Sequence, residues 1–222
     1  MKREKDFFDC FTEKDLEDRP QFCYRPFYRD GFVMATDLAI LVRVPYNSLQ
    51  GVYDKSEQPK RIPDFPKPNC DFELPLATIV KTIKSVPEVE EVRVHGLAAE
   101  CDECDGSGTV EWVYEDSDGE EHRKDFDCPI CDGRGKVKTK KYLREWRCIK
   151  INDTIFSVRA LMKLAKAMDV AGFDAVNVRN LPTGYTPALM CLGDNIEVII
   201  MPCSKESNPI RKIKLSNGEK EE

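Results

Sequence analysis

The chain has 222 residues, of which 41% are hydrophobic and 33% are charged, and its formal net charge is −6. This length suits one ordinary domain, or one domain that carries a sizeable insertion. No apolar run reaches the roughly 18 residues needed to cross a bilayer, which excludes a transmembrane protein. The first six residues lack the apolar core of a signal peptide, so we expect a cytoplasmic protein with no membrane partner.

Charge is divided unevenly along the chain. Between Cys101 and Gly135 there are twelve acidic and three basic residues, a local charge of −9, so the remainder carries +3. The mild overall acidity argues against a protein that simply coats nucleic acid, but it permits a local basic surface on the remainder. Ten cysteines in a cytosolic chain indicate metal ligands and buried thiols rather than disulfides.

The first half of the chain is predicted to begin with strands. Residues 22–45 are aromatic and β-branched, with a turn signal at 29–31. Residues 54–70 contain four prolines, which predicts an irregular loop. Apolar residues at helical spacing then predict a helix over 73–86, and alternation predicts a strand over 89–98.

The pattern resumes after the cysteine-rich segment with a strand over 137–151. A helix is predicted over 157–170, with Gly172 as its stop signal. Three strands should follow, at 175–179, 187–192 and 196–201. The polar tail from 204 is predicted to be mobile.

Two copies of the pattern C-x-x-C-x-G-x-G lie in the acidic segment, at 101–108 and 128–135. Two residues between cysteines let both thiolates face one ion, and the glycines allow the positive-φ turn that such a zinc knuckle needs. Four thiolates form a closed tetrahedral shell with no position for a substrate, which is typical of a structural site. The pattern therefore predicts one structural zinc ion, bound by Cys101, Cys104, Cys128 and Cys131.

The alternatives are four free or disulfide-bonded cysteines, or a thioredoxin-like redox motif, which would have a single C-x-x-C at a helix start. The doubled motif resembles the cysteine-rich zinc finger of DnaJ-type (Hsp40) co-chaperones. That family has four copies that bind two zinc ions, so two copies imply one zinc here. The J-domain signature is absent, because neither His95 nor His122 precedes Pro-Asp.

The residues between the two knuckles predict a β-hairpin with its turn at 116–119. The whole insert leaves and re-enters the body through the predicted strands 89–98 and 137–151. We therefore expect a finger on a two-stranded stalk.

Residues 30–45, DGFVMATDLAILVRVP, resemble a stretch of bacterial DNA polymerase III beta sliding clamps in which a strand, an Ala-Thr-Asp turn and a second strand follow one another. Residues 196–202, IEVIIMP, resemble the apolar strand ending in Met-Pro that closes clamp domains. Clamps usually continue Gly-His-Arg after the Ala-Thr-Asp turn, whereas this chain has Leu38-Ala39-Ile40. The resemblance implies antiparallel sheet with two helices on one face.

Basic residues form stripes on both predicted helices. Arg159, Lys163 and Lys166 fall at i, i+4 and i+7 of the second helix, and Lys81 and Lys84 form a shorter stripe on the first. In a clamp, helices of this kind face DNA and hold phosphates without reading bases. The alternative is an ordinary solvated helix face.

Together these features predict an α+β protein: an antiparallel sheet with two helices on one face, forming one sliding-clamp-like domain, plus an inserted zinc-binding β-hairpin finger. The expected limits are 1–99 and 136–203 for the body, 100–135 for the finger and 204–222 for a mobile charged tail.

No nucleophile–base pair, phosphate loop or open metal site is evident, so we expect no enzymatic activity. The first hypothesis is a clamp-like accessory factor of DNA replication or repair, with the finger as a docking arm. Its partners would be DNA and replication or repair proteins. A clamp ring is built from six such domains, so this single domain either binds further copies of itself to encircle DNA or does not encircle DNA at all. The second hypothesis is a zinc-dependent adaptor or co-chaperone-like module without nucleic acid, and a thiol redox enzyme is the third.

Overall fold

The computed structural model describes residues 3–13, 19–53, 58–93, 99–137, 139–182, 186–204 and 209–215. The chain divides into two compact units, which we call the body and the finger unit. The body is formed by residues 1–87 and 144–222, and the finger unit by residues 88–143. Within the described residues, no helix is long and apolar enough to cross a membrane.

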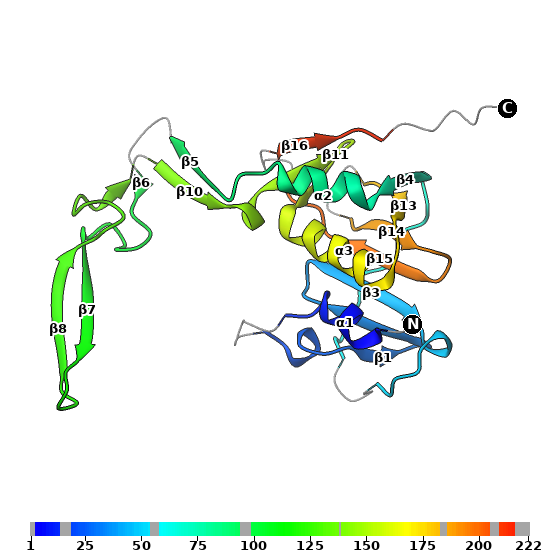
Figure 1. Ribbon diagram of the computed structural model, residues 1–222, viewed down its shortest axis with the longest axis horizontal. Helices are drawn as coiled ribbons and strands as arrows, with labels where there is room; N and C mark the ends of the chain where they lie inside the picture. Colours follow the sequence, from blue (N-terminus) through cyan, green and yellow to red (C-terminus); the bar gives the residue numbers. More distant parts are fainter. Residues whose placement is uncertain are drawn as a thin grey trace. The chain divides into compact units, whose positions relative to one another are not determined.

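A seven-stranded sheet forms the frame of the body, and every neighbouring pair in it is antiparallel (Figure 1). Its order is β1 (Phe27–Arg29), β2 (Phe32–Thr36), β3 (Ile40–Pro45), β15 (Ile196–Ile200), β14 (Ala188–Leu192), β13 (Ala175–Asn180) and β4 (Phe72–Pro75). A smaller sheet contains β12 (Thr154–Ser157), β11 (Cys148–Ile151) and β16 (Pro209–Ile213), with β16 parallel to β11. Single 3₁₀ turns occupy Gln21–Cys23, Tyr46–Ser48 and Arg144–Trp146.

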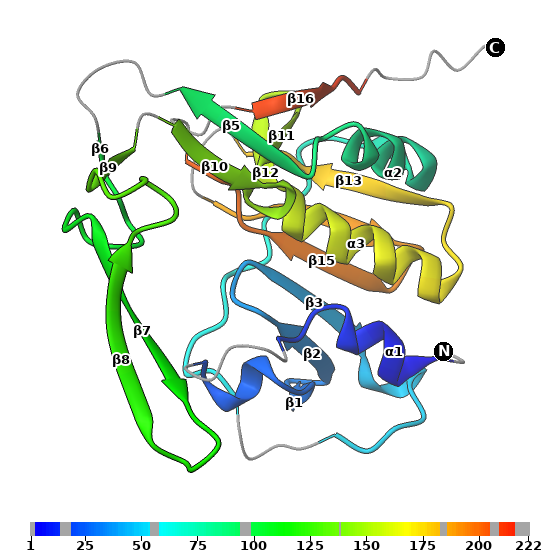
Figure 2. The ribbon, with the colours of Figure 1, turned by 60° about the vertical axis from the view of Figure 1, so that its left-hand side comes forward.

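Helices α2 (Leu76–Lys84) and α3 (Val158–Ala171) lie side by side on one face of the large sheet (Figures 1 and 2). The Oγ of Ser157 caps the start of α3 by accepting the N–H of Ala160, and Gly172 ends it with a φ of 76°. Leu161, Leu164, Ala165 and Met168 are buried as predicted, whereas Met162 is exposed. The predicted fold class, an α+β protein with antiparallel sheet and two helices on one face, is confirmed.

A third helix, α1 (Glu4–Asp9), was not predicted. It buries Phe7 and Phe8 in the same core as the two longer helices. A six-residue helix is too short to show a helical period, so burial of its aromatic side chains, rather than its own sequence pattern, accounts for its stability.

The proline-rich segment covers part of the opposite face of the large sheet. Residues 58–71 form no helix or strand, as predicted. Ile62 and Phe65 pack there against the buried side chains of Leu41, Leu189 and Ile199. The sheet thus buries apolar residues on both faces where this segment crosses it.

Three boundaries differ from the prediction. The helix expected over 73–86 begins only at Leu76, because Pro75 is extended and 72–75 pairs with β13 as β4. The strand expected over 137–151 is divided into β9 (Lys136–Val137), β10 (Thr139–Leu143), the 3₁₀ turn and β11. The tail expected to be mobile from 204 contains β16, which is held by ladder bonds to β11 and by the buried Ile213; residues 205–208 and 216–222 lie outside the described part.

The finger unit consists of three antiparallel strand pairs. Strand β5 (Val89–Arg93) pairs with β10, β6 (Ala99–Glu100) with β9, and β7 (Thr109–Glu115) with β8 (Glu121–Asp127). The expected two-stranded stalk is therefore present in β5 and β10, although its residues 94–98 lie outside the described part. The stalk belongs to the finger unit, which spans 88–143 rather than 100–135.

Candidate metal centre and apolar pocket

The four predicted metal ligands come together at the base of the β7–β8 hairpin. All four are buried, and their Sγ atoms lie within 4.8 Å of one another. The Sγ atoms of Cys101 and Cys128 are 3.8 Å apart, and so are those of Cys104 and Cys131. In a tetrahedral site with Zn–S bonds of about 2.3 Å, neighbouring sulfurs lie about 3.8 Å apart. The donor set and its spacing therefore fit a zinc ion with a closed shell.

The two knuckles are built alike. In the first, the N–H of Gly108 donates to the Sγ of Cys104 over 3.3 Å, and in the second, Gly135 makes the same bond to Cys131 over 3.2 Å. The carbonyl of Gly108 also accepts the N–H of Cys128 at 2.8 Å, across the two knuckles. The two N–H to Sγ bonds stabilise the negative charge of a thiolate. The bond between Cys128 and Gly108 holds one knuckle against the other.

The closing glycines also allow the knuckles to touch. Gly108 and Gly135 have φ angles of 87° and 65°, in the left-handed region. A Cβ added to Gly108 would lie 2.5 Å from the carbonyl oxygen of Gly133, and one added to Gly135 would lie 2.1 Å from that of Gly106. The pattern thus requires glycine at these two positions both for its backbone angle and for its lack of a side chain.

Without a bound metal, the two thiols of the first knuckle titrate differently. Burial raises the pKa of Cys101 to about 11. Burial also disfavours the thiolate of Cys104, but the N–H of Gly108 and the neighbouring thiols outweigh it and lower the pKa of Cys104 to about 7. The thiolate of Cys104 can therefore form near neutral pH, whereas a bound metal would have to displace the proton of Cys101.

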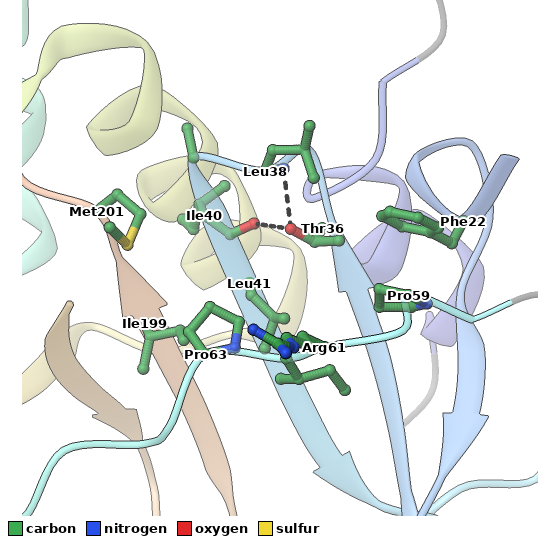
Figure 3. Close-up of a pocket in the computed structure, with 12 residues that line it drawn as sticks. Phe22, Thr36, Leu38, Ile40, Leu41, Pro59, Arg61, Pro63, Ile199 and Met201 are labelled. Atoms are coloured by element: carbon green, nitrogen blue, oxygen red, sulfur yellow. Dashed lines mark hydrogen bonds between the residues drawn. The ribbon is translucent and has the colours of Figure 1, made fainter. Parts of the chain in front are cut away.

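A second candidate site is an apolar pocket on the body, where β3 and β15 meet the proline-rich segment (Figure 3). Its volume is about 400 Å³, including the part open to solvent. Arg61 supplies positive charge in the lining, and the apolar side chains around it are Phe22, Leu38, Ile40, Leu41, Pro59, Ile62, Pro63, Ile199 and Met201. Sequence reasoning missed this pocket, because nothing in the proline-rich segment indicated where it packs.

Leu38 at the pocket has an unusual backbone conformation. Its φ is 79°, although it is not glycine, and the residue is 48% exposed. The N–H of Leu38 donates to the Oγ1 of Thr36, which itself donates to the carbonyl of Ile40 (Figure 3). Left-handed backbone costs a leucine about 1–2 kcal/mol, and such strain is concentrated at functional sites.

The turn that presents Leu38 is held by a buried carboxylate. The Oδ1 of Asp37 accepts the backbone N–H groups of Ala39 and Ile40, both at 2.9 Å. Its Oδ2 accepts the ammonium of Lys163 at 2.7 Å, and Lys163 also donates to the carbonyl of Thr12. With side chains only 5% and 16% exposed, Asp37 and Lys163 form a largely buried ion pair between the β2–β3 turn and α3.

The five predicted DNA-binding cations have two kinds of surroundings. Lys163 is paired as described, and Arg159 forms an ion pair with the carboxylate of Glu13. Both charges are thus balanced by carboxylates, although the Arg159 side chain is 45% exposed and that of Lys163 only 16%. The other three side chains are exposed on α2 and α3 and have no carboxylate partner described above: Lys81, Lys84 and Lys166.

No protein-family model matches the chain, and no curated protein matches its sequence. Solved structures with similarity include three DNA polymerase III beta sliding clamps. The clamp of C. crescentus is 10% identical with a TM-score of 0.43, over 90% of this chain and 64% of the clamp chain. The clamp of Bartonella birtlesii is 13% identical with a TM-score of 0.44, over 91% of this chain and 64% of the clamp chain. The beta subunit of Thermotoga maritima is 14% identical with a TM-score of 0.41, over 91% of this chain and 62% of the other. The chain thus spans less than two thirds of these clamps' length.

Proposed function

We propose that the protein is a non-catalytic, zinc-binding accessory factor of DNA replication or repair that docks partner proteins. One observation carries this proposal. The two stretches with clamp-like sequence, 30–45 and 196–202, are neighbours in the sheet, with Leu41 opposite Ile199, and both line the apolar pocket. A concave apolar site with one cationic side chain is suited to hold a few apolar side chains of a partner protein.

The zinc ion would have a structural role in this protein. Four sulfur ligands would fill its coordination shell, so no substrate or water could bind to it. The hairpin β7–β8 is a two-stranded ribbon, which is at best marginally stable alone in water. Zinc binding at its base would therefore supply folding free energy to the finger.

DNA contact is proposed for the exposed cations Lys81, Lys84 and Lys166. Each phosphate contact contributes about 0.9 to the slope of log affinity against log salt. Three contacts therefore correspond to about a 40-fold loss of affinity between 50 and 200 mM salt. Changing all three lysines to Glu should abolish that part of the salt dependence, measured by retention of the full chain on a DNA duplex.

The matched control carries the same charge change elsewhere on the body: Lys60→Glu, Lys67→Glu and Lys212→Glu, all at exposed positions. If both triple variants lose the same affinity, the effect is one of net charge and the helix assignment is wrong. If the parent protein does not bind DNA at about 50 mM salt, the second function, a zinc-dependent adaptor without nucleic acid, replaces the first. The observation that favours this adaptor is that Arg159 and Lys163 are already paired with carboxylates of the same chain, Glu13 and Asp37.

A further inference from the structure

The hairpin of the finger has two chemically different faces. Residues directly opposite each other in the β7–β8 register share a face, and side chains alternate along each strand. One face, which we call the aromatic face, therefore carries the opposed pairs Val110 and Phe126, Trp112 and Lys124, and Tyr114 and His122.

The aromatic face is exposed and ordered by its own contacts. Trp112, Tyr114 and Phe126 are 59%, 60% and 45% exposed. The Trp112 and Phe126 rings are 5.7 Å apart, and the Lys124 ammonium lies 5.1 Å from the centre of the Phe126 ring. Tyr114 stacks on His122 at 5.0 Å. Large aromatic side chains held in this way lose little conformational entropy on binding and often anchor interfaces.

The opposite face is acidic, and every carboxylate on it is exposed: Glu111, Glu115, Glu121, Asp125 and Asp127. Arg123 lies among them, 3.4 Å from carboxylate oxygens of Glu111 and Glu121. With the knuckles included, residues 101–135 carry −9. This charge would repel a phosphate backbone, and it would also repel a second copy of the same finger. It attracts a partner of opposite charge.

We propose that the aromatic face docks a basic segment of a partner protein, with apolar side chains of that segment on Trp112, Tyr114 and Phe126. The ribbon is only two strands wide, so long cationic side chains of the partner can reach around its edges to the carboxylates of the opposite face. The inference adds a second docking surface to the partner-docking role proposed above and rests on that role.

Fluorescence of the zinc-loaded full chain tests this directly. The chain has two tryptophans, and Trp146→Phe leaves Trp112 as the reporter on the aromatic face. The probes are a ten-residue peptide of alternating Lys and Leu, its Glu and Leu counterpart, and single-stranded oligothymidylate. We expect the basic peptide alone to saturate and shift the Trp112 emission, with binding that weakens as salt rises.

Two single substitutions locate the surface. Phe126→Ser should weaken binding of the basic peptide at least tenfold. Val113→Ser is the matched control, because Val113 is 50% exposed on the opposite face of the same hairpin and should change binding less than twofold. One zinc equivalent in each variant shows that the finger remains folded.

Equal binding of the acidic peptide, or equal losses in Phe126→Ser and Val113→Ser, would overturn the proposal. Tighter binding of oligothymidylate would mean that the face stacks bases instead. Retention on duplex DNA, measured with the same variants, is expected to be unchanged in Phe126→Ser. If the parent protein binds the basic peptide but not duplex DNA, the proposed role in replication or repair is wrong and the docking proposal for the aromatic face stands.

Discussion

Replacing Gly108 by alanine should weaken zinc binding far more than replacing Gly106, its neighbour in the same knuckle. Both residues have left-handed backbones, with φ of 87° and 79°. The nearest atom to an added Cβ at Gly106 is 3.5 Å away, in the side chain of Glu100, whereas at Gly108 the carbonyl oxygen of Gly133 is 2.5 Å away. Comparing the two alanine variants therefore separates the free-energy cost of the left-handed backbone from that of the steric clash between the knuckles.

The expected magnitude follows from these two contributions. Left-handed backbone costs each alanine variant about 1–2 kcal/mol. Overpacking adds about 1–3 kcal/mol at Gly108 alone, because the second knuckle must move away. At 1.4 kcal/mol for each factor of ten, Gly108→Ala should bind zinc roughly 5- to 150-fold more weakly than Gly106→Ala. Displacement of Gly108 would also lengthen the bond from its N–H to the Sγ of Cys104.

Competition with a chromophoric zinc chelator measures both variants at one pH. The pH must be fixed, because the ligands lose protons on binding and acid weakens the affinity of every variant. Equal affinities of the Gly106 and Gly108 variants would refute the argument, since they would mean that the knuckles do not approach each other as closely as the structure has them.

Three further predictions concern the metal, the module and the ion pair. Protein purified without added zinc should contain one equivalent, which Cys131→Ser should lose and Cys191→Ser should keep; zinc retained by Cys131→Ser would contradict the ligand set. Replacing residues 101–135 by a short Gly-Ser turn should leave the body's cooperative thermal unfolding intact, because the body has its own core, and loss of the transition would show the opposite. Lys163→Met leaves the carboxylate of Asp37 buried and unpaired, so it should destabilise the body by about 3 kcal/mol, or roughly 6–12 °C in Tm. The exposed Lys166→Met should cost less than about 0.5 kcal/mol by the same calorimetry, and similar losses in both would refute the role of the pair.

The cluster of four cysteines could be predicted from the sequence because its geometry is local. Two residues between cysteines determine that both sulfurs face one point, and each closing glycine lies four residues after a cysteine whose Sγ its N–H reaches. A β-hairpin between the knuckles then brings the two pairs together without any contribution from the body. Helix α3 could also be predicted, because its stripe of apolar residues, the Ser157 N-cap and the Gly172 C-cap are all local features of the sequence.

Other features depended on contacts between distant parts of the chain. Lys163 has the same spacing as any exposed cation on a helix, but its partner Asp37 is 126 residues away, and only the fold brings the two together. Strand β16 looked like a charged tail because its pairing with β11 and the burial of Ile213 leave no periodic signal in so short a segment. The pocket likewise needed the proline-rich segment to be placed on the sheet. The sequence alone determined what is set by chain geometry over a few residues, whereas burial and charge pairing across the fold were decided by the tertiary structure.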